Sequence, residues 1–247
     1  MIRFEQVTKV LGGREVLSDL TFEIRKGEVF TIVGSSGSGK SVTLKHIVRL
    51  LTPTSGAVWV GDTEVSAAGG RKLEKVRERF GYLFQGGALL GWMSVYENVA
   101  LPLREKTHLS SAAIDKRVME VLKMVGLERD GDKLPSEISG GMQKRAGLAR
   151  AIVRQPEIVL YDEPTSGLDP VTSRTIDKLI RSLNTELGIT SVVVTHDLQG
   201  ALMTADRIAM LAEGRFIEMN APAAFVKTEQ PKARAFLDAQ FIKEGSF

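Results

Sequence analysis

The sequence predicts an α/β fold whose mainly parallel β-sheet has its faces covered by helices. Apolar runs such as VFTIV (29–33) and TSVVVT (190–195) lack the alternation of half-buried strands, which indicates strands buried on both faces. Segments with helical periodicity separate such runs along the chain. Of the 247 residues, 43% are hydrophobic and 26% charged, which is typical of a globular protein long enough for one large domain.

The N-terminal third has the pattern of several strands and one helix. Strands are predicted over residues 2–7, 14–24, 27–34, 55–62 and 80–84. A turn is expected at 12–14 and a loop at Gly69–Gly70. The pattern is helical from Lys40 to Leu51, and Pro53 ends it. The basic segment 71–80 is interpreted as a solvated helix face, because a nucleic-acid-binding protein would need a stronger basic stripe.

The middle of the chain, about residues 94–154, is predicted to be a helical subdomain inserted into the sheet domain. Ser110 and Ser139 stand where helix N-caps are expected, and Gly126 stands at a helix end. Beyond this subdomain, strands are predicted over residues 157–162 and 190–195, and helices over 170–187 and 197–204. A hairpin that turns at Glu213–Gly214 is predicted over residues 207–219.

The last residues, 221–247, are expected to form a helical tail of what is otherwise a single domain, 1–247. Phe225, Phe236 and Leu237 are expected to pack back on the domain, whereas Phe241 packs there or contacts a second copy. The final KEGSF is expected to fray.

Composition also restricts the cellular setting. The chain has no cysteine, which fits a reducing compartment and excludes disulfides and thiolate metal sites. The first residues lack the apolar core of a signal peptide, and no apolar run is long enough to span a bilayer. We therefore expect a soluble protein that reaches a membrane only through a partner or its surface.

The segment GSSGSGKS (34–41) follows an apolar strand and opens a helix, which is the context of a phosphate-binding P-loop. Its glycines let backbone N–H groups turn towards phosphate oxygens, and the start of the helix adds a positive dipole. Lys40 is expected to reach the β- and γ-phosphates, and the Ser41 hydroxyl to bind Mg²⁺. The predicted nucleotide-binding residues of this segment are Gly34, Ser35, Ser36, Gly37, Ser38, Gly39, Lys40, Ser41 and Val42.

Acidic and polar side chains follow three other predicted strands. Asp162 ends the strand IVLYD and is the expected second Mg²⁺ ligand, and Glu163 is placed to orient or deprotonate the attacking water. His196 follows TSVVVT and is expected to contact the γ-phosphate. Gln85 follows FGYLF and is expected to contact Mg²⁺ or the water. The carboxyl ends of parallel strands face the ligand, so these residues fit one ATP site.

A second anion site is predicted at ISGGMQKR (138–145). Ser139, Gly140 and Gly141 form a helix N-terminus with little side-chain bulk. Because one P-loop has little use for two phosphate sites, we expect a head-to-tail homodimer with ATP between the two copies. The alternative is an ordinary helix cap with tolerated glycines.

Together these motifs resemble, in order and over nearly the whole chain, the nucleotide-binding subunits of ABC transporters. In that resemblance GSSGSGKS is Walker A, Gln85 the Q-loop, ISGGMQKR the signature, IVLYDE Walker B, SGLD (166–169) the D-loop with Asp169 at the nucleotide, and His196 the switch histidine. The family implies a P-loop NTPase sheet domain with a helical subdomain, an antiparallel β-subdomain near the N-terminus, and ATP with Mg²⁺.

The sequence departs from that family at two places. The region that often carries an adenine-stacking aromatic is KVLGGR, so Leu11 or Val10 would pack on the base instead. Met142 stands where the signature usually has glutamine, and the contacts of Ser139 to Gly141 are expected to survive.

An apolar stretch interrupted by glycines begins at Phe84, and its amino-acid sequence indicates one branch of the ABC transporter family. Gly86–Met93 is predicted to form a groove for a helix of a membrane permease, with Trp92 as the anchor, while Val99 and Leu101 pack inward. The alternative is that the stretch fills its own core. LFQGGALLGWMSVYENVALPLRE resembles ATPases of MCE-type lipid transporters, including Mla phospholipid systems.

That resemblance implies an MCE-domain lipid-binding protein and a STAS-domain partner, and a place on the cytoplasmic face of the bacterial inner membrane. Amino-acid or small-solute import remains the alternative transport function. A soluble ABC ATPase acting on nucleic acid would carry coiled-coil insertions or tandem cassettes, and a small-molecule kinase would have no use for the signature or SGLD.

Overall fold

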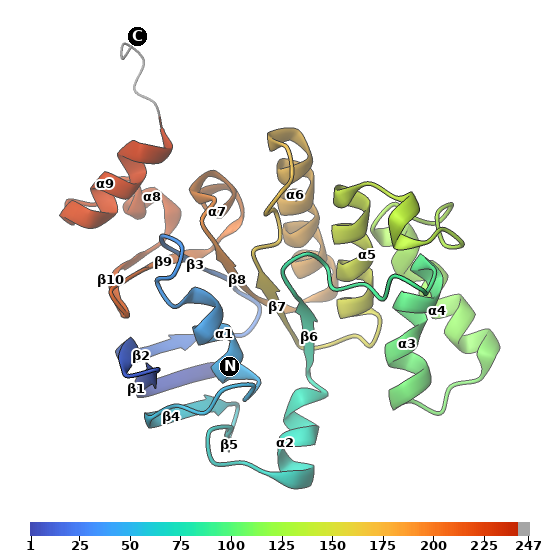
Figure 1. The fold of residues 1–247 in the computed structure, drawn as a ribbon, viewed down its shortest axis with the longest axis horizontal. Coiled ribbons are helices and arrows are strands. Elements are labelled where there is room, and N and C mark those ends of the chain that lie inside the picture. The colour runs from blue at the N-terminus through green and yellow to red at the C-terminus, as the bar shows by residue number, and fades with distance from the viewer. Residues whose placement is uncertain (242–247) are drawn as a thin grey trace. The chain divides into compact units, whose positions relative to one another are not determined.

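The computed structural model describes residues 1–241, drawn as a coloured ribbon in Figure 1. The chain divides into two compact units. The first unit combines Met1–Glu78 with the chain from Thr190 onwards, and the second is Arg79–Ile189. The expectation for residues 243–247 lies outside the described residues. Within residues 1–241, every helix is too short or too polar to cross a bilayer.

The first unit contains a four-stranded antiparallel sheet in the order β2–β1–β4–β5. Its strands are β1 (Ile2–Leu11), β2 (Arg14–Ile24), β4 (Ser55–Val60) and β5 (Thr63–Glu64). β1 extends beyond the predicted residues 2–7, because it pairs with β2 as far as Leu11 opposite Arg14. Phe4 and Phe22 stack on the buried face, with ring centroids 4.5 Å apart.

The first unit also contains the parallel strands that carry the functional loops. β3 (Val29–Val33) pairs in parallel with β8 (Thr190–Thr195) and with β9 (Arg207–Ala212). All residues of β3 and β8 are buried, as their unbroken apolar runs predict. β9 and β10 (Arg215–Asn220) form the predicted hairpin, and Glu213 and Gly214 both have the positive φ of a two-residue turn.

The helices of this unit are α1 (Lys40–Ile47), α2 (Gly70–Arg77), α7 (Leu198–Thr204), α8 (Pro222–Phe225) and α9 (Pro231–Gln240). The predicted end of α1 at Leu51 is wrong. Arg49 adopts a left-handed φ of 52°, and the N–H of Leu50 donates to the carbonyl of Lys45 over 2.8 Å, which closes the helix early. In the tail Phe225 and Leu237 are buried and Phe236 packs against them, as predicted.

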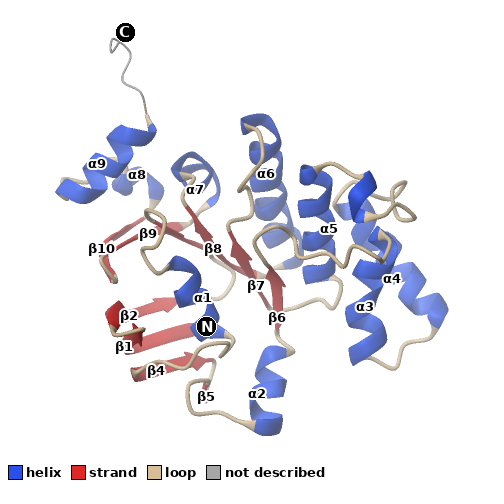
Figure 2. Ribbon diagram, in the orientation of Figure 1, coloured by secondary structure: helices blue, strands red, loops and turns tan. Residues whose placement is uncertain are grey.

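The second unit places β6 (Phe80–Leu83) parallel to β7 (Ile158–Asp162) and adds four α-helices (Figure 2). They are α3 (Val95–Lys106), α4 (Ser111–Met124), α5 (Gly140–Ile152) and α6 (Pro170–Leu187), with a short 3₁₀ helix at Pro135–Glu137. The predicted N-caps are confirmed, because Ser110 Oγ accepts from the N–H of Ala113 and Ser139 Oγ from that of Met142.

Candidate functional site

The loop of residues 34–39 connects β3 to α1 in the first unit. Gly39 has a φ of 105°, and a Cβ there would lie 2.9 Å from Leu17 Cδ2 and 3.0 Å from the Val16 carbonyl oxygen. Only glycine therefore fits at this position. The Lys40 side chain is buried and its ammonium donates to the carbonyls of Gly34 and Ser35 over 2.9 and 3.0 Å. The lysine thus curls back over its own loop.

The chemistry of this loop suits a phosphate group. The Ser38 hydroxyl is buried and has no hydrogen-bond partner among the described residues. The first backbone N–H groups of α1 and the Lys40 ammonium add donors and positive charge beside it. Ser35, Ser36 and Gly37 are exposed on the loop. This donor set fits the triphosphate of ATP.

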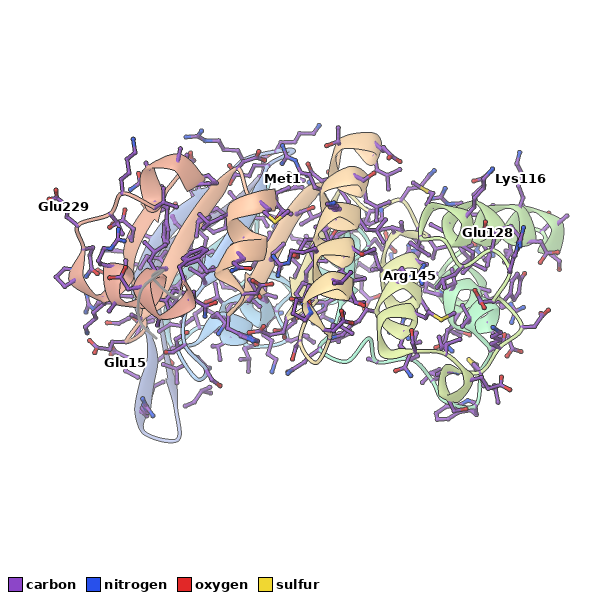
Figure 3. The ribbon with its side chains drawn as sticks, turned by 90° about the horizontal axis from the view of Figure 1, so that it is seen from above. Met1, Glu15, Lys116, Glu128, Arg145 and Glu229 are labelled. Carbon is purple, nitrogen blue, oxygen red and sulfur yellow. The ribbon has the colours of Figure 1, made fainter. Side chains whose placement is uncertain are left out.

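A cavity of about 700 Å³ opens at the loop and lies wholly within the first unit. Its lining includes Ser35–Ser38, the β1–β2 hairpin residues Arg14–Val16 and the hairpin turn at Glu213–Gly214. Glu15 is labelled on its hairpin in Figure 3. Val10 and Leu11 do not line the cavity, and both are more than a third exposed at the end of β1. The contact of Leu11 with adenine stays a prediction.

His196 leaves the parallel strands at the same edge as the P-loop. Val33, the last residue of β3, pairs with Thr195, the last residue of β8. Gly34 and His196 therefore begin their loops side by side in the first unit. The His196 side chain is exposed, and the next residue, Asp197, caps α7 by accepting from the N–H of Gly200 over 3.0 Å.

The second unit holds the predicted carboxylates at the end of β7. Asp162 is buried, and the Tyr82 hydroxyl donates to its Oδ2 over 3.5 Å. Burial, together with the Asp162 carboxylate, raises the pKa of Tyr82. Leu83, the last residue of β6, pairs with Tyr161, so Gln85 and Asp162 leave their strands at one edge. Glu163 has a left-handed φ of 49°, a strain found often at functional sites.

Sequence reasoning missed Lys144 of α5, which is 5% exposed. Its ammonium donates to the main-chain carbonyl of Glu163 over 3.3 Å. Burial lowers the pKa of Lys144, and the carboxylates of Glu163 and Asp162 oppose this effect. Its spacing of three and four residues from the buried Gly141 and Leu148 is the signal that could have shown a lysine on the core face of this helix.

The predicted second anion site lies at the start of α5. Ser139 and Gly140 are exposed there, with the serine bonded to the helix N-terminus. Gly141 is buried instead, and a Cβ on it would lie 2.5 Å from Thr172 Cγ2 of α6. Asp169 caps α6, and its Oδ1 accepts from the N–H groups of Val171 and Thr172 over 3.0 Å. A hydrogen bond from the Thr172 side chain, together with these N–H groups, lowers the pKa of Asp169. Gly141 and Asp169 therefore also have structural roles in the second unit.

The apolar segment Gly86–Met93 is held by two side chains that sequence reasoning did not single out. Asn98 is buried; its Oδ1 accepts from the N–H of Leu90 and its Nδ2 donates to the carbonyls of Leu90 and Met93. Arg150 donates to the carbonyls of Gly87 and Ala88 over 2.8 and 2.9 Å. These bonds fix the course of a segment that has no regular secondary structure.

Trp92 is 77% exposed at the end of this segment. Beside the segment lies a groove of about 420 Å³, lined by Tyr82, Phe84, Ala88, Leu101, Pro102 and Arg150 among others. Tyr82 and Phe84 stack there with ring centroids 4.0 Å apart. Val99 is buried as predicted, whereas Leu101 is only half-buried, because it faces the groove.

The predicted metal ligands Ser41, Gln85 and Asp162 provide a hydroxyl, an amide and one carboxylate. Among residues 1–241 no group of three histidine, cysteine or acidic side chains is placed to hold a metal ion. Ser41 belongs to the first unit, and Gln85 and Asp162 belong to the second. Each offers an oxygen of the kind that binds Mg²⁺, an ion that takes most of its remaining ligands from phosphate and water.

The model of the ABC transporter family matches residues 17–166. Among curated proteins, the chain is 41% identical over 98% of its length to the probable ribonucleotide transport ATP-binding protein mkl of Mycobacterium leprae, covering 70% of that protein. It is 41% identical over 94% of its length to the methionine import ATP-binding protein MetN of Carboxydothermus hydrogenoformans, covering 70% of that protein. It is 37% identical over 96% of its length to the intermembrane phospholipid transport system ATP-binding protein MlaF of Escherichia coli K12, covering 88% of that protein.

A solved structure is similar over nearly its whole length. It is the dimeric, post-hydrolysis state of the ATP-binding cassette MJ0796 bound to ADP and Pi, with a TM-score of 0.82 and 36% identity. The match covers 90% of this chain and 99% of that one. The fold, the motif order and the phosphate chemistry of the loop at 34–41 agree with this likeness.

Proposed function

This chain belongs to the ABC transporter family as an ATP-binding, ATP-hydrolysing subunit, and we propose that its transporter moves phospholipid between the membranes of a bacterial envelope. The phosphate-fitting loop supports the ATPase activity, which uses Mg²⁺. Members of this family act as dimers with membrane permeases, and we place this subunit on the cytoplasmic face of the inner membrane. The likeness to MlaF, an intermembrane phospholipid transport ATP-binding protein, supports the lipid substrate. The MCE-domain and STAS-domain partners are proposed from the resemblance of the segment Phe84–Leu103 to ATPases of MCE-type transporters.

The P-loop residues bind the nucleotide in this proposal. The Lys40 ammonium turns from its loop carbonyls to the β- and γ-phosphates, and backbone N–H groups of the loop surround the same oxygens. Ser41, Asp162 and Gln85 would hold Mg²⁺, which would supply positive charge at the phosphates. The α5 N-terminus of a second copy, at its Ser139 and Gly140, supplies further N–H donors.

Glu163 orients the attacking water and accepts its proton, and His196 contacts the γ-phosphate. Glu163 follows β7 directly and has a left-handed φ of 49°, a strained conformation that recurs at functional sites and supports this role. Loss of phosphate after hydrolysis removes the contacts that favour the closed dimer. The exposed Trp92 and the groove beside it transmit this change to the permease.

The observation that carries the transport role is the exposure of Trp92 on a segment pinned by Asn98 and Arg150. A large exposed aromatic on a rigid support is typical of a protein interface anchor. The competing substrate class is an amino acid or other small solute, which the likeness to MetN supports.

The test is purification of tagged Glu163→Gln protein from its native membranes with ATP and Mg²⁺ in mild detergent. Mass spectrometry then identifies the bound proteins and lipids. A polytopic permease with an MCE-domain protein and phospholipid is the expected result. A permease with a solute-binding protein would move the chain to solute import, and recovery of soluble partners alone would contradict the membrane role.

A further inference from the structure

The cavity at the P-loop has a wall that no nucleotide-binding motif of the sequence includes. Lys232, Ala235 and Phe236 of α9 line it together with Ser35–Ser38 and Val16. We propose that α9 is part of the nucleotide site and that the Phe236 ring contacts the base of ATP. This inference rests on the proposed binding of phosphate by the P-loop.

The C-terminal helix is fixed in this position by its opposite face. Ala233 and Leu237 are buried in a cluster with Phe225 and with Val33, the residue directly before the P-loop. The Lys232 ammonium lies 2.5 Å from the Glu213 carboxylate in the β9–β10 turn, and Gln230 caps the helix by accepting from the N–H of Ala233. One stripe of α9 therefore enters the core, while residues 232, 235 and 236 form the neighbouring stripe at the cavity.

The chemistry of this wall suits the part of a nucleotide that the P-loop does not bind. Phe236 is the one aromatic side chain that lines the cavity within residues 1–241, and Val16 adds apolar surface. Arg14 and Lys232 line the same space together with Glu15 and Glu213, so its charges balance and the ring is the feature that points to a base. Aromatic rings stack on nucleobases with little base preference.

Phe236 also supplies the aromatic ring that the KVLGGR region lacks. Leu11 is not among the residues that line the cavity, and neither it nor Val10 carries a ring that could stack on the base. An aromatic contact from α9 replaces that ring with one more than 200 residues further along the chain. Nucleotide binding then stabilises the docked tail, because each group orders the other.

The test compares ATP with inorganic tripolyphosphate, which has no base, on the purified full chain. Phe236→Ala is expected to raise the Kd for ATP about tenfold and leave the Kd for tripolyphosphate unchanged. Phe241→Ala is the matched control, because Phe241 is exposed on the same tail and does not line the cavity. Photolabelling with 8-azido-ATP should mark the peptide that contains α9.

Two further variants separate the possible failures. Ala235→Glu adds a carboxylate at an exposed position of the wall and should weaken both ligands without disturbing the core. Lys40→Ala should weaken both ligands whatever α9 does. If Lys40→Ala binds ATP normally, the P-loop assignment is wrong. If only Lys40→Ala weakens binding, and α9 is not labelled, the role of α9 alone is refuted.

Discussion

The ammonium of Lys144 lies 3.3 Å from the main-chain carbonyl oxygen of Glu163, the residue proposed to activate water. The N–H of Ser166 donates to the same oxygen over 3.2 Å. Two donors therefore bind the carbonyl of Glu163, whose φ of 49° costs conformational energy for any residue other than glycine. Lys144 thus links the helix α5 to the end of β7, where the residue proposed to activate water stands.

We predict that Lys144→Met lowers kcat for ATP roughly tenfold, about 1.4 kcal/mol in the barrier, and leaves KM nearly unchanged. The Glu163 backbone relaxes without its charged donor, whereas the nucleotide cavity in the first unit does not include Lys144. Lys144→Arg keeps a cation and should recover part of kcat. Steady-state ATPase assays check both parameters.

The control for this prediction is Lys116→Met, which removes a lysine that is exposed on α4 (Figure 3). It should leave kcat and KM as they are. A Lys144→Met protein with the kcat of the wild type would show that the contact with Glu163 has no part in turnover.

Trp92→Asp is expected to abolish co-purification with the permease and to leave the ATPase activity of the isolated subunit intact. The substitution replaces the proposed aromatic anchor by a charge, while the exposed side chain contributes little to the core. Leu109→Asp is the control, because Leu109 is an apolar residue of the same unit whose surface is 47% exposed. Equal recovery of permease with both variants would refute the docking role.

Asn98→Ala should lower the free energy of unfolding by about 2–4 kcal/mol. The partly buried N–H of Leu90 loses its acceptor, and the carbonyls of Leu90 and Met93 lose a donor. Urea denaturation measures the loss. Fluorescence of Trp92, read in a Trp59→Phe background, should show the apolar segment moving at lower urea than the rest of the protein.

Asp177 makes stability depend on pH in a defined direction. Burial raises its pKa from 3.8 to about 6, although Arg174 opposes the shift. Between these pH values the folded protein binds a proton that the unfolded chain does not bind, so the contribution of Asp177 to stability falls as pH rises. As the pH rises from 4 to 7, the free energy of unfolding of Asp177→Asn should increase by roughly 2–3 kcal/mol relative to that of the wild type.

Denaturation of both proteins at several pH values checks this prediction, and their difference isolates the single carboxyl. A difference that does not change with pH would mean that Asp177 keeps its ordinary pKa in the folded protein.

Many local features could be predicted because they depend on neighbours in sequence. Ser110 and Ser139 cap helices through bonds to residues three positions on, and Glu213–Gly214 turns a hairpin. The buried strands β3 and β8 follow from unbroken apolar runs. The end of α1 could not be predicted, because nothing in its residues requires Arg49 to adopt a left-handed φ.

The sequence by itself determined the family, the P-loop between a strand and a helix, and the residues that follow each parallel strand. Only the tertiary structure decided that Lys144 donates to the carbonyl of Glu163 and that Asn98 bonds to the segment that carries Trp92. It also decided that Phe236 lines the P-loop cavity. The physical reason is the separation, along the sequence, of the residues that make each contact. Turns, caps and phosphate loops are made by residues a few positions apart, whereas a wall built from α9 requires packing between Leu237 and Val33, which are far apart in the chain.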